Sequence, residues 1–514
     1  MSNTTINLAS ALMGSGKTRS MVKGIDDEAL YLVAAPKRDL CRDIFSAFKS
    51  LRPDVEVEII NADSVSPDGT VLSEAVETIE TANEEYEFSE SFSTKGSAGR
   101  VLILTQTTLA NLPPHLLENW TVILDEVPDI QSNLYKNIYS DQFDRMFDET
   151  VKMDTKTGEL SLEDGMEFKA AERLHKARSA ELHHEALVYD GLLHPTSEVT
   201  AEPRTGDKYI LKSTGYVDYA PIFKAAKEVH VMGNAIRKTL FYLYLEAQGF
   251  SFDVSEFTPE FRGYKVPPKM VPLISGDRFS KRMMLTRPDG TESDAFDSST
   301  VGWKLLKDGL DYHAGEPLLV HIYDWMKPFF NEHTYPNVVV IKLDSRGLNR
   351  YRDYHRTTHL IHGNAAPVNS QMNQRMLEMM GVDRKAGLKA IRHERLIETI
   401  SQAMLRTGMR DVQGQTHQTV TVVPTMGLID DIRENLEIDV EVDTSLLREP
   451  PKSIEKTSHS PAKEARRESK RSAKQEKKEK ALELLSRGWT VTAAAQEIGK
   501  SRKTVQRWAT ACGR

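Results

Sequence analysis

A glycine-rich segment near the start of the chain has the residue types that bind phosphate groups. The segment reads Ala11-Leu-Met-Gly14-Ser-Gly16-Lys17-Thr18. It fits the phosphate-loop pattern, with alanine at the first fixed position in place of glycine, and it lies between an apolar run and a helical pattern. Glycines let backbone N–H groups turn toward phosphate oxygens, and the following helix adds a partial positive charge. The predicted nucleotide-binding residues are Gly14, Ser15, Gly16, Lys17 and Thr18.

Two consecutive carboxylates, Asp125 and Glu126, follow a second apolar run at residues 121–124. In a parallel sheet, the end of such a strand lies beside the phosphate loop. We therefore predict that Thr18 and Asp125 hold Mg²⁺, and that Lys17 reaches the terminal phosphates of ATP. Glu126 would orient and deprotonate the attacking water. The alternative is a pair of surface acids at the end of a strand.

The elements that must position these groups have the pattern of an α/β protein. Short apolar runs bounded by turns suit buried parallel strands, and helical segments lie between them. The predicted strands are residues 5–9, 30–35, 55–60, 101–105, 121–124, 229–232, 318–323, 338–343, 359–362, 419–423 and an alternating edge strand at 436–443. The predicted helices are residues 18–24, 39–48, 172–186 and 396–405.

The composition is that of a globular protein with several domains. The chain has 514 residues, which suits roughly three to four domains. Its two cysteines, Cys41 and Cys512, exclude a disulfide framework and a cysteine-based zinc site. No apolar run approaches the ~20 residues that span a bilayer, and the chain does not begin like a signal peptide. We therefore expect a cytoplasmic protein with no membrane partner.

The formal net charge of −8 conceals an uneven distribution of charge. Residues 451–514 carry 17 Lys and Arg against 7 Asp and Glu, a net charge of +10, and the rest of the chain carries −18. A basic tail on an acidic body suggests that the tail contacts nucleic acid. For the Lys- and Glu-rich stretch 451–480, a solvated linker is an equal alternative.

These motifs together resemble superfamily 2 DExD/H helicases and translocases. The phosphate loop resembles their motif I, and Asp125-Glu126-Val-Pro resembles motif II. The segments Ala34-Ala-Pro36-Lys37-Arg38 and Thr105-Gln-Thr107-Thr108-Leu109 resemble two motifs that contact the nucleic-acid backbone in that family. The resemblance therefore implies nucleic-acid contacts by Pro36, Lys37, Arg38, Thr107 and Thr108. Hydroxyls, N–H groups and basic side chains at strand ends suit phosphates.

Later segments extend this resemblance with departures. Gly233-Asn234-Ala235 stands where family members usually have Ser-Ala-Thr, and residues 344–349 resemble motif V. A stretch from Gln402 to Arg410 resembles motif VI, although its second arginine falls one position later than usual. The family implies that Arg406 and Arg410 stabilise charge on the transferred phosphoryl group from a second domain. The alternative is a solvated helix face.

The resemblance implies an α/β fold with two RecA-like parallel-sheet domains of the P-loop type, with insertions, and a small all-helical domain at the end of the chain. The predicted boundaries are 1–245 for the first RecA-like domain, 246–300 for a connecting region, 301–447 for the second RecA-like domain, 448–478 for a charged linker and 479–514 for the helical domain. Within the first domain we expect an acidic, irregular insertion at about 61–100 and an unassigned insertion at about 131–225.

The last segment has the pattern of a helix-turn-helix. Residues 481–508 contain three short helical stretches, a small Ala495, a turn at Gly499, and Thr490 or Thr492 as the cap of the middle helix. It resembles resolvase or transposase helix-turn-helix domains, whose second helix enters the major groove of DNA. The predicted DNA contacts are Lys500, Arg502, Lys503, Gln506 and Arg507. A helical interaction domain with a basic face is the alternative.

Other clusters are assigned structural roles. The histidines at 175, 183 and 184 lack the spacing of a common metal motif, and we expect solvated helix residues. Met372, Met376 and Met379 recur at helical spacing and are expected in the core.

The sequence therefore predicts an ATP hydrolase of the DNA helicase or translocase type, with ATP and Mg²⁺ as cofactors. Its nearest resemblance is to viral or phage origin-binding-protein helicases, which suggests replication initiation. The implied partners are single-stranded or duplex DNA and replication proteins. The oligomeric state stays open. One alternative is a DNA-binding regulator with a nucleotide switch. Another is a terminase-type packaging ATPase, for which the acids at 437, 439, 441 and 443 would be nuclease residues.

Overall fold

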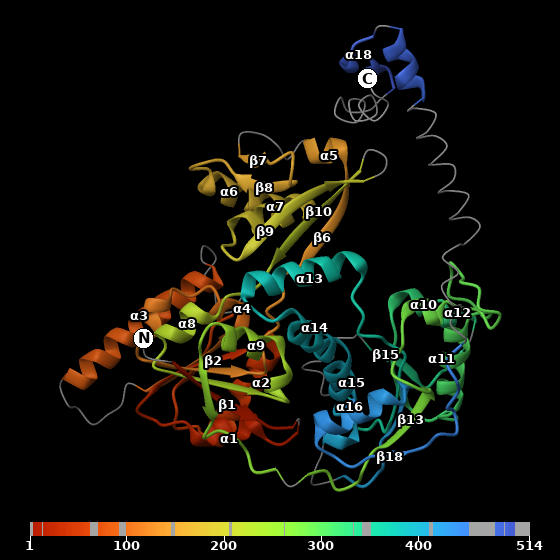
Figure 1. Cartoon of the computed structure of the whole chain (residues 1–514). Coiled ribbons are helices and arrows are strands. Elements are labelled where there is room, and N and C mark those ends of the chain that lie inside the picture. The colour runs from red at the N-terminus through yellow and green to blue at the C-terminus, as the bar shows by residue number, and fades with distance from the viewer. Residues whose placement is uncertain are drawn as a thin grey trace. The chain divides into compact units, whose positions relative to one another are not determined.

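The structure is a computed structural model. It describes residues 4–12, 14–61, 70–91, 99–144, 150–204, 208–261, 263–332, 334–341, 351–410, 415–451, 479–487 and 489–498. The chain forms two compact units, one of Met1–Arg287 with Glu292–Glu449 and one of Pro288–Thr291 with Pro450–Arg514. The first unit contains two α/β lobes and an insertion (Figure 1).

The first lobe is built on a seven-stranded sheet in which every pairing is parallel. Its order is β12-β1-β11-β5-β2-β4-β3. The strands are β1 (Thr5–Ser10), β2 (Leu30–Ala35), β3 (Val57–Ile59), β4 (Arg100–Thr105), β5 (Trp120–Asp125), β11 (Glu228–Gly233) and β12 (Ser251–Val254). Its helices include α1 (Lys17–Gly24), α2 (Arg38–Leu51), α4 (Gln106–Leu109), α8 (Ala220–Ala225) and α9 (Leu240–Ala247). All the strands therefore end at the same edge.

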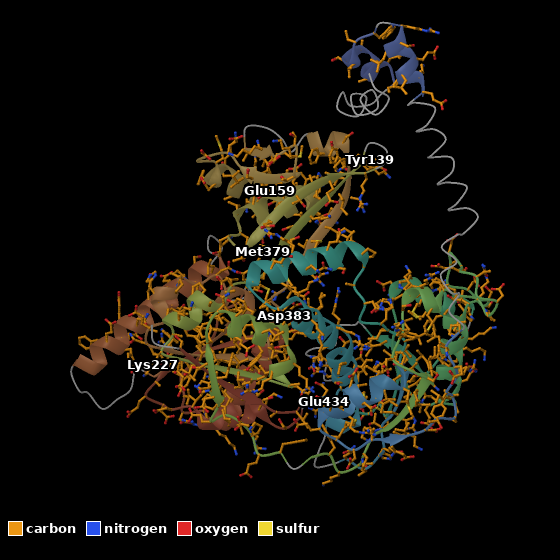
Figure 2. The ribbon with its side chains drawn as sticks, viewed as in Figure 1. Tyr139, Glu159, Lys227, Met379, Asp383 and Glu434 are labelled. Atoms are coloured by element: carbon orange, nitrogen blue, oxygen red, sulfur yellow. The ribbon has the colours of Figure 1, made fainter. Side chains whose placement is uncertain are left out.

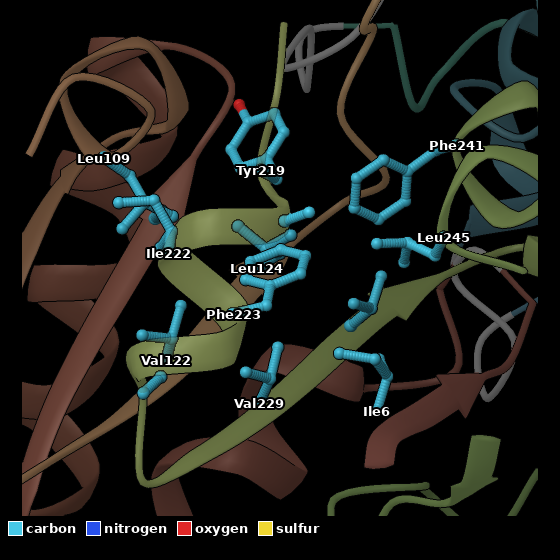
Figure 3. Close-up of a cluster of buried hydrophobic side chains, with 14 of the residues drawn as sticks. Ile6, Leu109, Val122, Leu124, Tyr219, Ile222, Phe223, Val229, Phe241 and Leu245 are labelled. Atoms are coloured by element: carbon cyan, nitrogen blue, oxygen red, sulfur yellow. The ribbon is translucent and has the colours of Figure 1, made fainter. Parts of the chain in front are cut away.

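Apolar side chains pack between the sheet and its covering helices and so stabilise the strand ends that carry the loops. Figure 3 shows Ile222 and Phe223 of α8 beside strand residues such as Val122 and Val229, with Phe241 of α9 nearby. These side chains are at most 2% exposed. Burial of side chains of this size contributes about 1.5–3 kcal/mol each. The loops that follow the strands are thereby built on a rigid base.

The acidic stretch that we expected to be irregular contains a long helix. This helix, α3 (Val71–Ser91), buries Ala75, Ile79 and Ala82 against the first lobe. These residues recur at helical spacing, and acidic residues occupy other faces of the helix. The prediction was wrong because the high acidic content concealed this narrow apolar stripe.

The insertion at 131–217 is an ordered α+β layer. Its five-stranded antiparallel sheet has the order β6-β10-β9-β8-β7. The elements are β6 (Leu134–Tyr139), α5 (Ser140–Asp144), β7 (Val151–Met153), β8 (Glu159–Leu162), α6 (Glu167–Ser179), α7 (His183–Leu193), β9 (Ser197–Pro203) and β10 (Lys208–Gly215). The single helix predicted at 172–186 is therefore two helices. His175 and His183 are exposed, as expected of solvated residues.

The second lobe has a six-stranded sheet, also parallel throughout, in the order β15-β14-β16-β17-β13-β18. Its strands are β13 (Lys269–Ile274), β14 (Leu318–His321), β15 (Val338–Ile341), β16 (Arg356–His359), β17 (Val420–Thr425) and β18 (Glu441–Val442). Its helices include α10 (Lys281–Met284), α11 (Val301–Asp311), α12 (Phe329–Glu332), α13 (Pro367–Met380), α14 (Arg384–Arg392), a π-helix (His393–Glu398), α15 (Thr399–Met404) and α16 (Gly427–Leu436). Two parallel-sheet α/β lobes confirm this part of the predicted fold class.

The boundaries of both lobes differ from those predicted. Residues 246–300 were expected to be a connecting region, but β12 belongs to the sheet of the first lobe and β13 to the sheet of the second. Pro272 concealed β13, because proline removes a ladder donor and usually argues against an inner strand. The expected strand at 436–443 is reduced to Glu441–Val442, because Leu436 ends α16 and Glu437 adopts a φ of 50°.

The helices between β16 and β17 pack on the first lobe. Met372, Met376 and Met380 of α13 are buried, as predicted for core residues, and Met379 is partly buried. Helix α13 packs against β10 of the insertion, and α14 packs against α9 (Figure 1). The two lobes therefore share an apolar interface.

The described part of the second unit contains a small apolar cluster. Ala481, Ala494, Ala495 and Ile498 are buried together. Helix α18 (Val491–Glu497) follows Thr490, whose hydroxyl accepts a hydrogen bond from Ala493 N at 3.2 Å. Thr490 is thus the helix cap, one of the two predicted positions. No helix in the described ranges has the length and apolar character needed to cross a membrane.

Candidate nucleotide and nucleic-acid site

The phosphate loop lies between β1 and α1, as the sequence predicts. Gly14 and Gly16 have φ values of 77° and 90°, which favour glycine. A Cβ at Gly14 would also lie 2.9 Å from the carbonyl oxygen of Arg410. The Nζ of Lys17 donates to the carbonyl oxygens of Ala11 and Leu12 at 2.6 and 3.0 Å. The carbonyl oxygens at the start of the loop thus hold the ammonium group of Lys17 within the loop.

The acidic pair lies beside this loop. Asp125 ends β5, and its Oδ1 accepts a hydrogen bond from Thr18 Oγ1 at 3.4 Å. Strand β11 separates β1 from β5 in the sheet, so this contact joins two strand ends that are next-nearest neighbours. The sequence analysis predicted that Thr18 and Asp125 lie close together, and the structure places them in contact although they are 107 positions apart.

Glu126 has a strained backbone that a neighbouring amide holds. Its φ is 79°, which is uncommon for a residue with a Cβ. Nε2 of Gln106 donates to the carbonyl oxygen of Glu126 at 2.7 Å, and Gln106 is 6% exposed. The hydroxyl of Tyr219 in turn donates to the Gln106 carbonyl oxygen at 3.1 Å. Our sequence analysis missed Gln106, which no rule of spacing relates to the acidic pair.

Arginines of the second lobe reach the acidic pair. Arg406 Nη2 lies 3.9 Å from Glu126 Oε1, and Arg406 is 4% exposed. Helix α15 ends at Met404, so Arg406 and Arg410 do not form the solvated helix face that we considered as the alternative. The backbone of Arg410 packs on Gly14, as described above. Both arginines therefore lie at the junction of the lobes.

Burial and charge perturb the ionisable groups of the site. Burial, and then the negative charge of Glu126, raise the pKa of Asp125 to about 7. Burial lowers the pKa of Lys17, and the neighbouring carboxylates oppose this effect. Burial and the positive charge of Arg406 lower the pKa of Arg410 to about 10, so Arg410 stays charged at neutral pH. Such perturbed groups are typical of functional sites.

The residues present fit a magnesium nucleotide. The hydroxyl of Thr18 and the carboxylate of Asp125 are oxygen donors of the kind that Mg²⁺ prefers. The hydroxyl oxygen of Ser15 is buried with no hydrogen-bond partner among the described residues. A buried polar atom of this kind favours a ligand with hydrogen-bonding oxygens. The glycines, Lys17 and the start of α1 suit phosphate groups.

A basic pocket lies at the same edge of the first sheet, at the ends of β2 and β4. Its volume is about 470 Å³, and it is lined by Pro36, Lys37, Arg38, Asp39, Arg42, Thr105 and Thr107. Four of the five predicted backbone-contacting residues are therefore together. Thr108 is not among the lining residues, and its backbone N–H donates to Thr105 Oγ1 at 3.2 Å. Our sequence analysis missed Arg42, which lies one turn beyond Arg38 on α2.

Some predicted residues lie outside the described part of the chain. They are Lys500, Arg502, Lys503, Gln506 and Arg507 of the helix-turn-helix and residues 344–349 of the motif V resemblance.

Acids near the end of the second lobe have structural partners. Glu441 binds Lys269 at 2.9 Å, and Asp443 accepts a hydrogen bond from the hydroxyl of Tyr312 at 2.6 Å. The described residues contain no group of three or more His, Cys, Asp or Glu that could hold a metal. The terminase alternative loses its support in the strand 436–443, which is largely absent.

The comparisons with known proteins concern a domain near the end of the chain and the fold of most of the chain. Residues 472–511 match the family model of a homeodomain-like domain, so the chain ends in a helix-turn-helix domain as predicted. A search of curated proteins finds no match.

The solved structures that are similar to this chain share little sequence identity with it. Xpd4 of S. tokodaii is 11% identical with a TM-score of 0.45, over 86% of this chain and 96% of Xpd4. S. cerevisiae Dbp5 bound to RNA and ADP BeF3 is 10% identical with a TM-score of 0.34, over 86% and 85%. Mss116p bound to ssRNA and AMP-PNP is 10% identical with a TM-score of 0.30, over 97% and 79%. At these identities the likeness concerns the fold alone.

Proposed function

We propose that this chain is an ATP-dependent DNA helicase or translocase that its terminal helix-turn-helix anchors to DNA. One observation carries the proposal: Arg406 of the second lobe lies 3.9 Å from Glu126 of the first, beside the phosphate loop. Because residues of both lobes form the site, a change in the distance between the lobes would change its activity. Hydrolysis can be coupled to movement along a nucleic-acid strand only if the site depends on the arrangement of the lobes in this way.

Each residue of the site has a role in this proposal. ATP supplies the phosphoanhydride bond that is hydrolysed, and Mg²⁺ neutralises phosphate charge. Lys17 and the N–H groups of the loop bind the phosphates, while Thr18 and Asp125 hold the metal. Glu126 orients a water molecule and accepts its proton. Arg406 and Arg410 stabilise the negative charge that develops during transfer.

The basic pocket would bind the backbone of the nucleic acid. Strands β2 and β4 are three and four positions from β1 in the sheet. At ~4.8 Å between strands, the pocket lies roughly 15–20 Å from the phosphate loop along one edge. The spacing allows a bound strand and a bound nucleotide to share this edge. The homeodomain-like domain suggests DNA as the partner, and the resemblance noted above suggests replication initiation in a phage or mobile element.

The test measures ATP hydrolysis with and without single-stranded DNA. We expect DNA to stimulate the parent chain and Glu126→Gln to lose hydrolysis in both conditions while it still binds nucleotide. Glu118→Gln, the same change at an exposed glutamate of the first lobe, serves as the matched control. A hydrolysis rate that is the same with and without DNA would favour the alternative of a DNA-binding regulator with a nucleotide switch. No hydrolysis in the parent chain would contradict the proposal that the protein is an ATP hydrolase.

A second experiment tests the anchor. Deletion of 451–514 removes a separate compact unit with a net charge of +10. The truncated chain should hydrolyse ATP at the parent rate without DNA but bind duplex DNA more weakly. The slope of log affinity against log salt should flatten by about 0.9 for each lost phosphate contact. An unchanged slope would contradict the role of the tail.

A further inference from the structure

The loop that follows β11 connects the phosphate loop to the second lobe. At its start, the carbonyl oxygen of Gly233 accepts a hydrogen bond from Ala11 N at 2.9 Å. Two positions later, Ala235 has a φ of 44°, a strained value for a residue with a Cβ. The hydrogen bond at Gly233 and the strained backbone at Ala235 together indicate that this loop is held in a defined position.

Three groups of this loop bind carboxylates of the second lobe. Nδ2 of Asn234 donates to Glu398 Oε2 at 3.1 Å. The backbone N–H of Leu240, at the start of α9, donates to Glu394 Oε1 at 2.7 Å. Lys238 forms an ion pair with Glu434 at 2.9 Å. The first two carboxylates come from one π-helical segment, His393–Glu398. Such segments occur frequently at functional sites.

Glu398 accepts hydrogen bonds from three side-chain amides. Besides Asn234, it accepts hydrogen bonds from Nδ2 of Asn435 at 3.2 Å and from Nε2 of Gln402 at 3.1 Å. Amide donors on three sides fix the carboxylate without neutralising it. Its negative charge also acts on the ammonium group of Lys17. Glu398 therefore contacts residues of both lobes and lies close enough to Lys17 for their charges to interact.

We propose that Glu398 is a positioning residue for ATP hydrolysis, which ties the loop at Asn234 to α15 and to the segment after α15 that carries Arg406. The proposal rests on the function proposed above. Arg406 lies eight residues after Glu398, with Gln402 midway on α15. A displacement of Gly233 with the phosphate loop moves Asn234, pulls on Glu398 and shifts the arginine relative to Glu126. The hydrogen bond between Asn234 and Glu398 thus links the nucleotide site to the second lobe.

The experiment reverses the polarity of the bond. Asn234→Asp places two carboxylates against each other, and Glu398→Gln removes the charged acceptor. In the double variant, the introduced aspartate would accept a hydrogen bond from the amide of the introduced glutamine. The amide of Asn435, which donates to the same oxygen of Glu398 in the parent chain, would turn to present its own oxygen to that glutamine, so the bond forms again. We expect each single variant to lower kcat for DNA-stimulated hydrolysis roughly tenfold with a smaller change in the KM for ATP, and the double variant to recover most of it.

The matched control is Glu434→Gln. It is the same chemical change at a carboxylate bound to the same loop, but the side chain of Glu434 is 74% exposed on α16 (Figure 2). Its kcat should stay within twofold of the parent chain. Thermal unfolding of every variant separates lost folding from lost positioning.

The outcomes distinguish this proposal from the proposed function. A parent chain without DNA-stimulated hydrolysis overturns the function itself. A stimulated parent with unaffected single variants overturns the role of Glu398. Folded single variants without recovery in the double variant also overturn it, because a positioning bond should work with either polarity. Should Asn234→Asp fail to fold, Glu398→Gln compared with Glu434→Gln still decides.

Discussion

The two lobes contribute to one site by different structural means. In the first lobe, the functional groups lie in short loops directly after strands of a parallel sheet, and the sheet fixes their separation. In the second lobe, Arg406 lies in an irregular segment after α15, and a π-helix precedes it. Strand order determines the first set of positions, whereas helix ends and contacts with the other lobe determine the second. We refer to the first lobe as the rigid half of the site, because strand order fixes its functional groups, whereas the position of Arg406 depends on contacts between the lobes.

The largest expected effect tests this division through Arg406. Arg406→Ala removes the cation beside Glu126 without altering the phosphate loop. We expect kcat for ATP hydrolysis to fall roughly a thousandfold with nucleotide affinity nearly unchanged. Steady-state kinetics and equilibrium binding of a fluorescent ADP analogue measure the two quantities.

Arg433→Ala is the control for this change. Arg433 belongs to α16 of the same lobe, is 44% exposed and pairs locally with Asp430 at 3.1 Å. Its kinetics should match the parent chain. If Arg406→Ala hydrolysed ATP normally, the first lobe would be sufficient and the comparison of the lobes would lose its basis.

A smaller effect is expected at Gln106, within the rigid half. Its amide holds the carbonyl oxygen of Glu126 at 2.7 Å while that residue keeps a φ of 79°. Gln106→Ala removes the donor, and loss of a buried hydrogen bond costs about 1–3 kcal/mol. We therefore expect kcat to fall roughly tenfold, because the catalytic carboxylate is less well oriented.

Asn111→Ala removes a comparable contact from an exposed position. Its Nδ2 donates to the carbonyl oxygen of Thr107 at 2.7 Å. Hydrolysis without DNA should be unaffected. Equal losses in the two variants would mean that α4 as a whole matters and that the strained peptide has no particular role.

The sequence predicted most of the first lobe and less of the second, for physical reasons. Gly14, Lys17 and Thr18 form a contiguous motif whose chemistry requires those residue types, so their arrangement could be predicted. Asp125 followed from the rule that parallel strands end at one edge. Contacts such as Gln106 with Glu126 depend on tertiary packing, and no periodicity reports them.

Single residues and local composition also concealed elements of the second lobe and of the acidic insertion. Pro272 concealed β13, and the acidic residues around Ala75 and Ile79 concealed the stripe of α3. The π-helix cannot be recognised from hydrophobic spacing, because that spacing assumes 3.6 residues per turn. Glu398, which this segment carries, was therefore not among the predicted site residues.

The last prediction has the smallest effect on hydrolysis at neutral pH, and it compares how the stability of the two lobes responds to acid. The second lobe buries His313 and His359 in its core, at 3% and 1% exposure. Burial lowers the pKa of His313 from 6.5 to about 4 and that of His359 well below its ordinary value. In the first lobe, burial lowers the pKa of His230 to about 4. Each of these histidines is neutral in the folded chain at neutral pH.

An unfolded chain binds a proton on such histidines near pH 6.5, and the folded chain does not. The free energy of unfolding should therefore fall as the pH decreases from about 6.5 toward 4, by up to about 3 kcal/mol for His313. With His359 adding to this loss, β14 and β16 should lose hydrogen-exchange protection at a higher pH than β1 and β5. Exchange corrected for its intrinsic rate at each pH measures this order. His313→Gln should weaken the pH dependence in the second lobe, and exposed His175→Gln should not. Earlier loss in the first lobe would show that its sheet is not the rigid half.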